Sequence, residues 1–249
     1  MAANEKTFLR KLRQAINDFG MIKSGEKVIV GISGWKDSMV MAWLLNKYRR
    51  IIKDKFEIRA FYVSWGPVED CFDFEDYKKF FDENFDFTLE KIEMNIPEGS
   101  KLLEWVWNSC QWCAYARRIS LMKMAGKINA TKIVLGHHMD DIVTTTMINM
   151  IQWRKLKIMP PVNKMRKGDI TFVRPMAYLR EHEIKAFAKK NKIPHSSCGC
   201  SVGSNTMRNN MKHNLIWANE EKYPNYTQNI FWALIKDFKE KYEKIDYSM

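Results

Sequence analysis

Long apolar runs are missing from this 249-residue sequence, and no uninterrupted hydrophobic stretch is long enough to span a bilayer. The first twenty residues carry Lys6, Arg10 and Lys11 without a long apolar core, unlike a signal peptide. Internal repeats and low-complexity linkers are also absent. Hydrophobic residues at 46% and charged residues at 28% are typical of a packed globular protein. We therefore expect a cytoplasmic protein with one substantial domain and no membrane partner.

Cysteine is scarce, and its count of five is odd, so a disulfide framework is not expected without a secretory signal. Four cysteines fall in two tight pairs, Cys110/Cys113 and Cys198/Cys200, and Cys71 stands alone. A CxxC pair suits a redox centre, half of a zinc site, half of an iron–sulfur site, or a buried core. The redox interpretation is disfavoured because the thioredoxin-like context after an early strand is missing.

Two common phosphate-binding signatures are absent, namely the Gly-Lys-Ser/Thr ending of a Walker loop and the three-glycine dinucleotide fingerprint. Instead, Ser33-Gly-Trp-Lys-Asp-Ser38 joins a β-branched segment, Lys27 to Ile32, to a helical pattern. A Ser/Gly turn at a helix start presents N–H groups where the helix dipole favours an anion. The alternative is that Asp37 and Ser38 only cap the helix.

Acidic residues are outnumbered, since Lys and Arg total 41 against 29 Asp and Glu, a net charge of +12. This excess favours a polyanionic partner such as RNA or DNA. The other possibility is that the basic residues only solvate helix faces. The excess is spread over short clusters: Arg49–Arg50, Arg117–Arg118, Arg154–Lys157, Lys164–Lys167 and Lys189–Lys192.

Apolar patterning alternates between strand-like and helix-like segments along most of the chain. This alternation predicts an α/β fold, a parallel sheet with helices on both faces, followed by a helical C-terminal tail. We divide the chain into a helical segment at 1–25, a nucleotide-binding domain at 26–200 and a helical segment at 201–249. The predicted strands are 27–32, 56–63, 88–94, 132–136 and 170–173, and the predicted helices are 5–19, 37–48, 74–85, 113–128, 141–152 and 181–191.

Ligands of such sheets bind at the carboxyl ends of the strands, which directs attention to the loops after Ile32, Val63, Met94 and Gly136. The last loop reads Gly136-His-His-Met-Asp-Asp141. A dedicated zinc site is disfavoured here because neighbouring loop residues point in different directions. A loop that gives main-chain contacts to a nucleotide and a carboxylate for Mg²⁺ or acid–base work fits better. Asp141 as a plain helix cap remains the alternative.

The first loop resembles the PP-loop signature of ATP pyrophosphatases, Ser-Gly-Gly-x-Asp-Ser. Members of that superfamily cleave ATP to AMP and pyrophosphate and transfer the adenylyl group to a substrate oxygen. Trp35 stands where the second glycine of the signature belongs. Glycine permits a close backbone approach to phosphate and a positive φ, and tryptophan does neither cheaply.

Further motifs follow the first loop in the order found in the tRNA 2-thiocytidine synthetase family, which the chain resembles from about Lys27 to about Arg208. The resemblance implies a homodimer, a [4Fe–4S] cluster held by three cysteines, ATP, Mg²⁺ and a tRNA substrate. The motifs are Cys110-x2-Cys-x3-Arg-Arg118, Gly136 to Asp141, Lys155 to Pro161, Arg174 to Glu181, and the cysteine pair after Ile193-Pro194.

Site residues follow from this resemblance position by position. The implied cluster ligands are Cys110, Cys113 and one of the second pair, with Cys198 preferred and Cys200 open because the family usually has CxxC there. Arg117, four residues after Cys113, falls on a basic catalytic position, and the other catalytic residues are Asp37 and Asp141, with Asp140 in the same motif. The implied nucleotide-binding residues are Gly31, Ser33, Gly34, Lys36, Asp37, Ser38, Val63, Gly136 and His137.

The chemistry is consistent with this set of residues. Adenylation converts a poor leaving group, the oxygen of a base carbonyl, into AMP, and an iron left open by three cysteines can hold a sulfide. A four-cysteine zinc site would be closed and structural. The leading hypothesis is an ATP-dependent tRNA thiolase with an unknown sulfur donor. The alternatives are an RNA-binding PP-loop protein with a structural zinc–cysteine site, favoured by Trp35, and an enzyme such as a lysine-adding tRNA enzyme, disfavoured by the paired cysteines.

Overall fold

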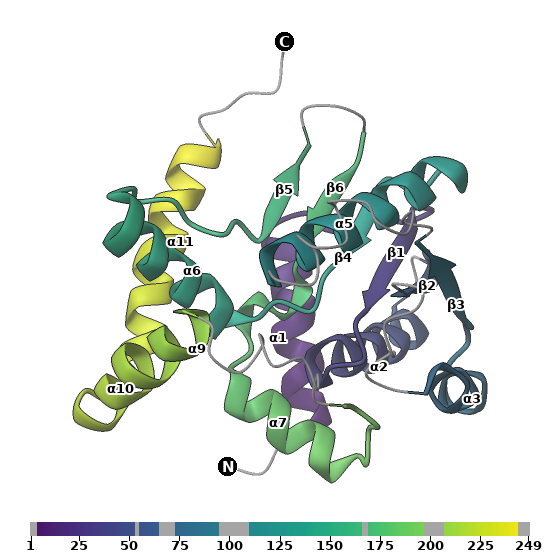
Figure 1. Ribbon diagram of the computed structural model, residues 1–249, viewed down its shortest axis with the longest axis horizontal. Coiled ribbons are helices and arrows are strands. Elements are labelled where there is room, and N and C mark those ends of the chain that lie inside the picture. Colours follow the sequence, from purple (N-terminus) through teal and green to yellow (C-terminus); the bar gives the residue numbers. More distant parts are fainter. Residues whose placement is uncertain are drawn as a thin grey trace, which may run out of the picture.

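The computed structural model describes residues 4–52, 55–64, 73–94, 110–165, 169–196 and 207–243, and their side chains except at 110–112 and 241–243. Within these ranges the strands form a six-stranded sheet in the order β3-β2-β1-β4-β6-β5 (Figure 1). All neighbouring strands are parallel except β5 and β6. The strands are β1 Lys27–Ile32, β2 Glu57–Ser64, β3 Leu89–Glu93, β4 Lys132–Val134, β5 Val162–Lys164 and β6 Thr171–Val173.

The antiparallel edge strand β5 was not among the predicted strands. It is three residues long, and only Val162 in it is buried. It follows Pro160-Pro161, so neither alternation nor a β-branched run could mark it in the sequence. β5 pairs with β6 through the register Val162–Val173, which places it at the free edge of the sheet.

Both faces of the sheet are covered by helices, as predicted. Val28, Val30 and Ile32 of β1 point into the larger core, and Ile29 between them points into a smaller core on the opposite face. The smaller core is closed by α5, Cys110–Lys127, through Leu121 and its neighbours. The larger core is closed by α1 Glu5–Asp18, α2 Lys36–Ile51, α3 Phe74–Asn84 and α7 Glu181–Lys190.

The C-terminal region is helical, as predicted. Figure 1 shows α6, α9, α10 and α11 gathered beside one edge of the sheet, with α3 beside the other. Phe231 and Ile235 of α11, like Phe8 and Leu12 of α1, belong to the larger core. Both predicted terminal segments therefore pack on the central region. The elements are α6 Met139–Trp153, the 3₁₀ helix η1 Pro175–Tyr178, α9 Met207–Met211, the π-helical segment η2 Lys212–Trp217, α10 Ala218–Lys222 and α11 Tyr226–Glu243.

Three helices begin earlier than predicted, and the first of them, α2, does so by one residue. α5 begins at Cys110, so the CxxC pair lies in the first turn of the helix and not before it. α6 begins at Met139, which moves Asp141 from the predicted helix start to the third helical position. None of the described helices combines the length and apolarity that crossing a membrane requires.

Candidate functional site

The loops after β1 and β4 meet where the order of the strands reverses. The chain runs outward from β1 through β2 to β3 and then returns to the other side of β1 as β4. Ligands of parallel α/β sheets bind at such a switch point. A Cβ atom on Gly136 would lie 2.9 Å from the Asp37 carbonyl carbon and 3.0 Å from the Ser38 nitrogen. Gly136 therefore permits a backbone contact between the two loops that a side chain would block.

Two serines hold the first loop, Ser33 to Ser38, in a closed turn. The Ser33 main-chain N–H donates to Ser38 Oγ at 3.1 Å, and the two hydroxyl oxygens lie 3.0 Å apart. Ser38 Oγ donates in turn to the Trp35 carbonyl at 2.9 Å. The turn is thus shaped before any ligand binds, with the start of α2 directed at its centre.

The backbone of Trp35 is not strained. Its φ of −78° and ψ of 154° are ordinary extended values, and the positive φ of the turn, +78°, falls on Gly34. The indole is 43% exposed. Trp35 itself is the N-cap residue of α2, so Asp37 and Ser38 lie inside the helix, and the hypothesis that they are its N-cap is wrong.

The Gly34 carbonyl ties two distant segments to the first loop. It accepts a hydrogen bond from the Ser196 main-chain N–H at 3.1 Å and from the Tyr77 hydroxyl of α3 at 3.4 Å. The chain therefore reaches the first loop two residues before Cys198. Cys198 and Cys200 themselves lie outside the described residues.

Asp141 is buried among cations. Its Oδ1 accepts from Lys212 Nζ at 3.0 Å and lies 3.5 Å from Arg208, while its Oδ2 accepts from the His138 main-chain N–H at 3.3 Å. Burial raises the pKa of this carboxyl, but the positive charges of His138, Lys212 and Arg208 outweigh burial and hold the pKa well below its usual range. His138 is the N-cap residue, so the hypothesis of Asp141 as the N-cap is wrong, although Asp141 does help to cap α6 from the third position.

Asp37 has a buried oxygen that accepts no hydrogen bond within the described part of the chain. This oxygen, Oδ1, lies 3.2 Å from Lys36 Nζ and 3.8 Å from His138 Nε2. Burial raises the pKa of Asp37, against the attraction of His138 and Lys36. A buried carboxylate oxygen that accepts no hydrogen bond suits a hard cation such as Mg²⁺.

The pKa values of the two histidines of the second loop are shifted in opposite directions. His138 lies among four carboxylates, 3.3 Å from Asp141, 3.6 Å from Asp140, 3.8 Å from Asp37 and 3.9 Å from Glu181. Burial lowers the pKa of His138, but Asp141 and its neighbours raise it above its ordinary value. Burial and the nearby Arg174 lower the pKa of His137 to about 3, so that ring is neutral at neutral pH.

Asp140, the other carboxylate of the GHHxDD motif, has a structural partner. Its oxygens accept from Arg180 Nε at 3.3 Å and from the Glu181 main-chain N–H at 2.8 Å, and its side chain is fully buried. Arg180 also donates to Glu220 of α10 at 3.2 Å and to Gln228 of α11 at 2.8 Å. The pair of Asp140 and Arg180 therefore ties α10 and α11 to the starts of α6 and α7.

The first turn of α5 lies at the same edge of the sheet, because α5 runs back toward the amino end of β4. Cys113 is half-buried, and its Sγ accepts from Arg117 Nη2 at 3.8 Å. Burial and the charge of Arg208 lower the pKa of Arg118, one residue on, which places this part of α5 near the Asp141 site. Among the described side chains no group of three or more His, Cys, Asp or Glu residues is arranged for a metal ion.

Gly31 and Val63 lie farther from the ligand side of the loops. A Cβ on Gly31 would meet Leu121 Cδ1 of α5 at 2.8 Å, so a side chain there would require the Leu121 side chain to move. Val63 is fully buried in the same small core. Both residues let α5 pack close to the strands that carry the site.

Glu181, Lys212 and Arg208 belong to the site and were missed from the sequence. Glu181 binds Lys36 through Oε1 at 3.1 Å and Lys212 through Oε2 at 2.7 Å. Lys212 and Arg208 lie in a polar, helix-like stretch of sequence in which no periodic pattern of apolar residues marks them. Only the position of Glu181, directly after the Arg174-to-Arg180 motif, hinted at a role.

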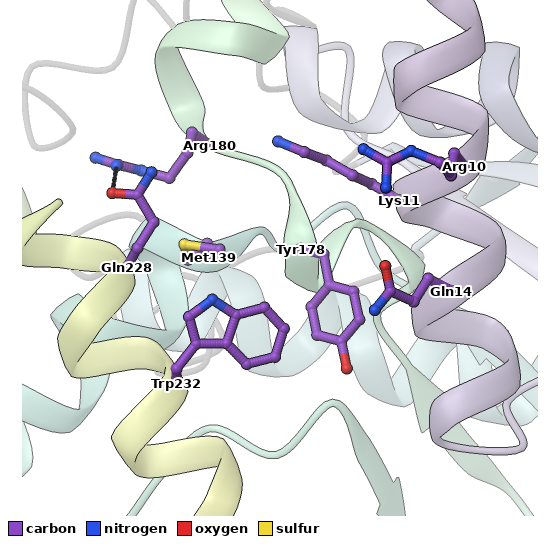
Figure 2. Close-up of a pocket in the computed structure, with 8 residues that line it drawn as sticks. All are labelled: Arg10, Lys11, Gln14, Met139, Tyr178, Arg180, Gln228 and Trp232. Carbon is purple, nitrogen blue, oxygen red and sulfur yellow. Dashed lines mark hydrogen bonds between the residues drawn. The ribbon is translucent and has the colours of Figure 1, made fainter.

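A cavity of about 250 Å³ lies beside the site, on the far side of Arg180, between α1, η1 and α11 (Figure 2). Arg180 donates to Gln228 at its rim, and the rings of Trp232 and Tyr178 are 5.0 Å apart along one wall. The first loop contributes no residue to it. Its lining is basic, amide and aromatic: Arg10, Lys11, Gln14, Met139, Tyr178, Arg180, Gln228 and Trp232.

Comparison with known proteins decides the family. The PP-loop domain family matches residues 4–219. Over 240 residues the chain is 36% identical to the tRNA-cytidine(32) 2-sulfurtransferase of Burkholderia lata, covering 93% of this chain and 69% of that protein. The chain belongs to the PP-loop family, in its group of tRNA sulfurtransferases. The protein of the same name from Polynucleobacter asymbioticus is also 36% identical, covering 92% of this chain and 76% of that protein.

Solved structures agree on the fold of this PP-loop protein. The U34-tRNA thiolase NcsA from Methanococcus maripaludis, determined with its [4Fe–4S] cluster, superposes with a TM-score of 0.76 at 22% identity, over 94% of this chain and 78% of that one. The NAD⁺ synthetase from Burkholderia pseudomallei superposes with a TM-score of 0.55 at 12% identity, over 97% and 90%. The predicted family, the α/β fold and the enzyme class, a sulfurtransferase, are confirmed.

Proposed function

We propose that the protein is an ATP-dependent tRNA thiolase that adenylates a base carbonyl and replaces its oxygen with sulfur at a [4Fe–4S] cluster. The observation that carries this proposal is that the two loops and the first turns of α5 lie at the same edge of the sheet. Gly136 lies against the backbone of Asp37, and Ala116, beside Arg117, packs against Met94, which directly follows β3. The names of the relatives identify cytidine 32 of tRNA as their substrate, so we propose a cytidine of tRNA as the substrate of this protein.

In the adenylation half of the reaction, the first loop and Lys36 bind the phosphates. Main-chain N–H groups at the start of α2 and the hydroxyls of Ser33 and Ser38 face the anion. Gly136 and His137 bring a second strip of backbone beside them, while Gly31 and Val63 support the nucleotide from the strands below. The base oxygen forms a bond to the α-phosphorus, and pyrophosphate leaves with the electron pair of the broken P–O bond.

Magnesium fits the carboxylates Asp37 and Asp141. The unused buried oxygen of Asp37 and the ionised state of Asp141 are the properties that a hard divalent cation requires of its ligands. The ion would neutralise charge on the phosphates during transfer. Asp141 also keeps His138 oriented through the main-chain hydrogen bond at the start of α6.

In the sulfur half of the reaction, the proposed cluster ligands are Cys110, Cys113 and Cys198, with Cys200 as the other choice for the third. Two observations fit this set. The first pair, Cys110 and Cys113, lies in the first turn of α5, and positions three apart share a helix face. The hydrogen bond of Ser196 ties the segment just before the second pair to the first loop. When bound, a three-cysteine cluster would supply a sulfide. Sulfide bonds to the activated carbon, and AMP leaves with the former base oxygen, while Arg117 offsets negative charge beside Cys113.

Partners and location complete the proposal. A tRNA substrate is consistent with the net charge of +12 and with a cytoplasmic location. A homodimer is retained from the family resemblance, and the sulfur donor is unidentified. The competing hypothesis of an RNA-binding protein without ATP turnover depended on Trp35, and its unstrained, partly exposed position weakens that argument.

ATP binding tests the role of Trp35. We expect the unaltered chain to bind Mg-ATP. We also expect Trp35→Gly to change the dissociation constant of Mg-ATP by less than about threefold. The reason is that Trp35 causes no backbone strain that its removal would relieve, and the indole is not itself a phosphate-binding group. Isothermal titration calorimetry measures both affinities, and pyrophosphate release in the presence of tRNA measures turnover. Binding that appears only in Trp35→Gly would favour the RNA-binding hypothesis instead.

The cluster is tested by colour and metal content. Protein purified without oxygen should be brown with broad absorption near about 400 nm, as thiolate-ligated iron–sulfur centres are. Cys113→Ala should lose the colour and most of the iron, because one of three ligands is removed. Cys71→Ala is the matched control and should stay brown, since Cys71 belongs to neither pair. Colourless protein with one tightly bound zinc per chain would overturn the cluster.

Binding of tRNA is tested through its salt dependence. Arg154, Lys155 and Lys157 lie exposed after α6, beside Trp153, whose side chain is 65% exposed and available to stack on a base. Changing the three cations to Gln should reduce the slope of log affinity against log salt by about two to three.

The matched control for this experiment is the triple change of Lys185, Lys189 and Lys192 to Gln, on and just after α7, which also removes three exposed cations. We expect it to leave the slope nearly unchanged. An equal loss in both variants would mean that only net charge matters, and no binding of tRNA by the unaltered chain at low salt would refute the substrate.

A further inference from the structure

Lys212 reaches the site from the C-terminal region, far along the chain from both loops. It is the first residue of the π-helical segment η2, between α9 and α10. Its side chain is only 10% exposed, and its Nζ lies 3.0 Å from Asp141 Oδ1 and 2.7 Å from Glu181 Oε2. π-Helical turns are rare and frequently occur at functional sites. A buried lysine here therefore calls for a reason beyond packing.

Glu181 holds two ammonium groups at once. Its Oε1 binds Lys36 of the first loop at 3.1 Å, and its Oε2 binds Lys212. Burial lowers the pKa of Lys212, but Asp141 and Glu181 outweigh it and raise the pKa above its ordinary value, so this lysine is a cation. The ammonium groups of Lys36 and Lys212 thus share the carboxylate of Glu181. The two oxygens of that carboxylate set the distance between the two ammonium groups.

We infer that Lys212 binds the pyrophosphate part of ATP together with Lys36, and that Glu181 holds the two ammonium groups in place until the phosphates replace it. This inference rests on the proposed function, because it assigns a further residue to the same nucleotide site. A diphosphate carries several anionic oxygens and can bridge two ammonium groups that already stand on neighbouring oxygens of one carboxylate. The second partner of Lys212, Asp141, is a carboxylate that Mg²⁺ would engage.

The arrangement gives the C-terminal segment a direct part in nucleotide binding. Arg208, one turn before Lys212, lies 3.5 Å from Asp141 and donates to Thr145 of α6 at 3.1 Å. The helical stretch from α9 to α10 is thereby held against α6 on the side where Lys212 enters the site. The positive charge that pyrophosphate requires on leaving is provided by this stretch as well as by the first loop.

The test is calorimetric titration of the full chain with Mg-pyrophosphate, Mg-ATP and AMP. Lys212→Met should weaken pyrophosphate and ATP binding by about 10- to 100-fold, the effect of losing one charge-assisted hydrogen bond, and leave AMP binding unchanged. Glu181→Gln should have the opposite effect and tighten pyrophosphate binding, because it removes the anion that competes for both lysines. A purely structural ion pair predicts no such gain.

The matched control is Lys11→Met. Lys11, in α1, pairs at 2.7 Å with Glu183 of α7, which lies two residues after Glu181. This pair lies outside the two loops, so the loss of Lys11 should leave pyrophosphate binding unchanged. If Lys212→Met does not fold, the double variant Lys212→Met/Glu181→Gln is compared with Glu181→Gln alone, since the pair of changes leaves fewer unbalanced charges.

Equal pyrophosphate affinity with and without Lys212 in either comparison would overturn the inference, and so would weaker binding by Glu181→Gln. The proposed function fails in a different way. An unaltered chain that binds neither ATP nor pyrophosphate would refute ATP-dependent thiolation itself, whereas normal binding with no effect of Lys212 would leave thiolation intact.

Discussion

Asp141→Asn should lower the rate of ATP-dependent tRNA thiolation by about a hundredfold or more, the range for losing a catalytic carboxylate. The substitution keeps the size of the side chain and an oxygen for the His138 main-chain N–H, but removes the negative charge. Without that charge the proposed Mg²⁺ site would lose a ligand, and Lys212 and Arg208 lose their anionic partner. Single-turnover thiolation with cluster-loaded enzyme measures the rate, and release of pyrophosphate shows whether adenylation is the step affected.

The matched control is Asp86→Asn, which neutralises a carboxylate bound to Arg50 at 2.7 Å on the surface. We expect no change in the rate. The iron content and melting temperature of Asp141→Asn should stay close to those of the unaltered chain. A variant that unfolds would instead show that the main work of Asp141 is to cap α6, and a variant with full activity would remove it from the catalytic set.

Arg180→Met should reduce the free energy of unfolding by about 3–5 kcal/mol, the usual loss when one member of a buried ion pair is removed. The side chain of Arg180 is 5% exposed and that of Asp140 is fully buried, so the substitution leaves an anion in the core without its guanidinium. It also removes the donors to Glu220 and Gln228, which hold α10 and α11. Chemical denaturation followed by circular dichroism measures the loss.

The control for Arg180 is Arg50→Met, which removes an exposed pair with Asp86 of similar length. It should cost at most about 1 kcal/mol, because water screens and replaces that interaction. Hydrogen exchange provides a second readout, and Arg180→Met should speed exchange in α11 before it affects β1. Equal costs for the two arginines would contradict the assignment of Arg180 as the link that holds α10 and α11 to the starts of α6 and α7.

The fold was largely predictable because the apolar pattern of its central strands reflects their burial. β1 is buried on both faces and reads as a continuous β-branched run, which is how strands of parallel sheets read. β5 was missed because three residues on an open edge with one buried side chain carry no period. The starts of α2 and α6 were misplaced because their N-cap residues, Trp35 and His138, are not among the usual capping types.

By itself, the sequence determined the parallel sheet, the two loops that meet at its switch point and the pairs of cysteines, since these depend on local patterns and short motifs. Only the tertiary structure decided which charges share the site. Glu181, Arg208 and Lys212 are separated from the first loop by more than half of the chain and look in sequence like residues of solvated helix faces. Their burial, and thus the strength of their interactions, arises from helices that pack over the loops, because charges attract strongly only where water is excluded.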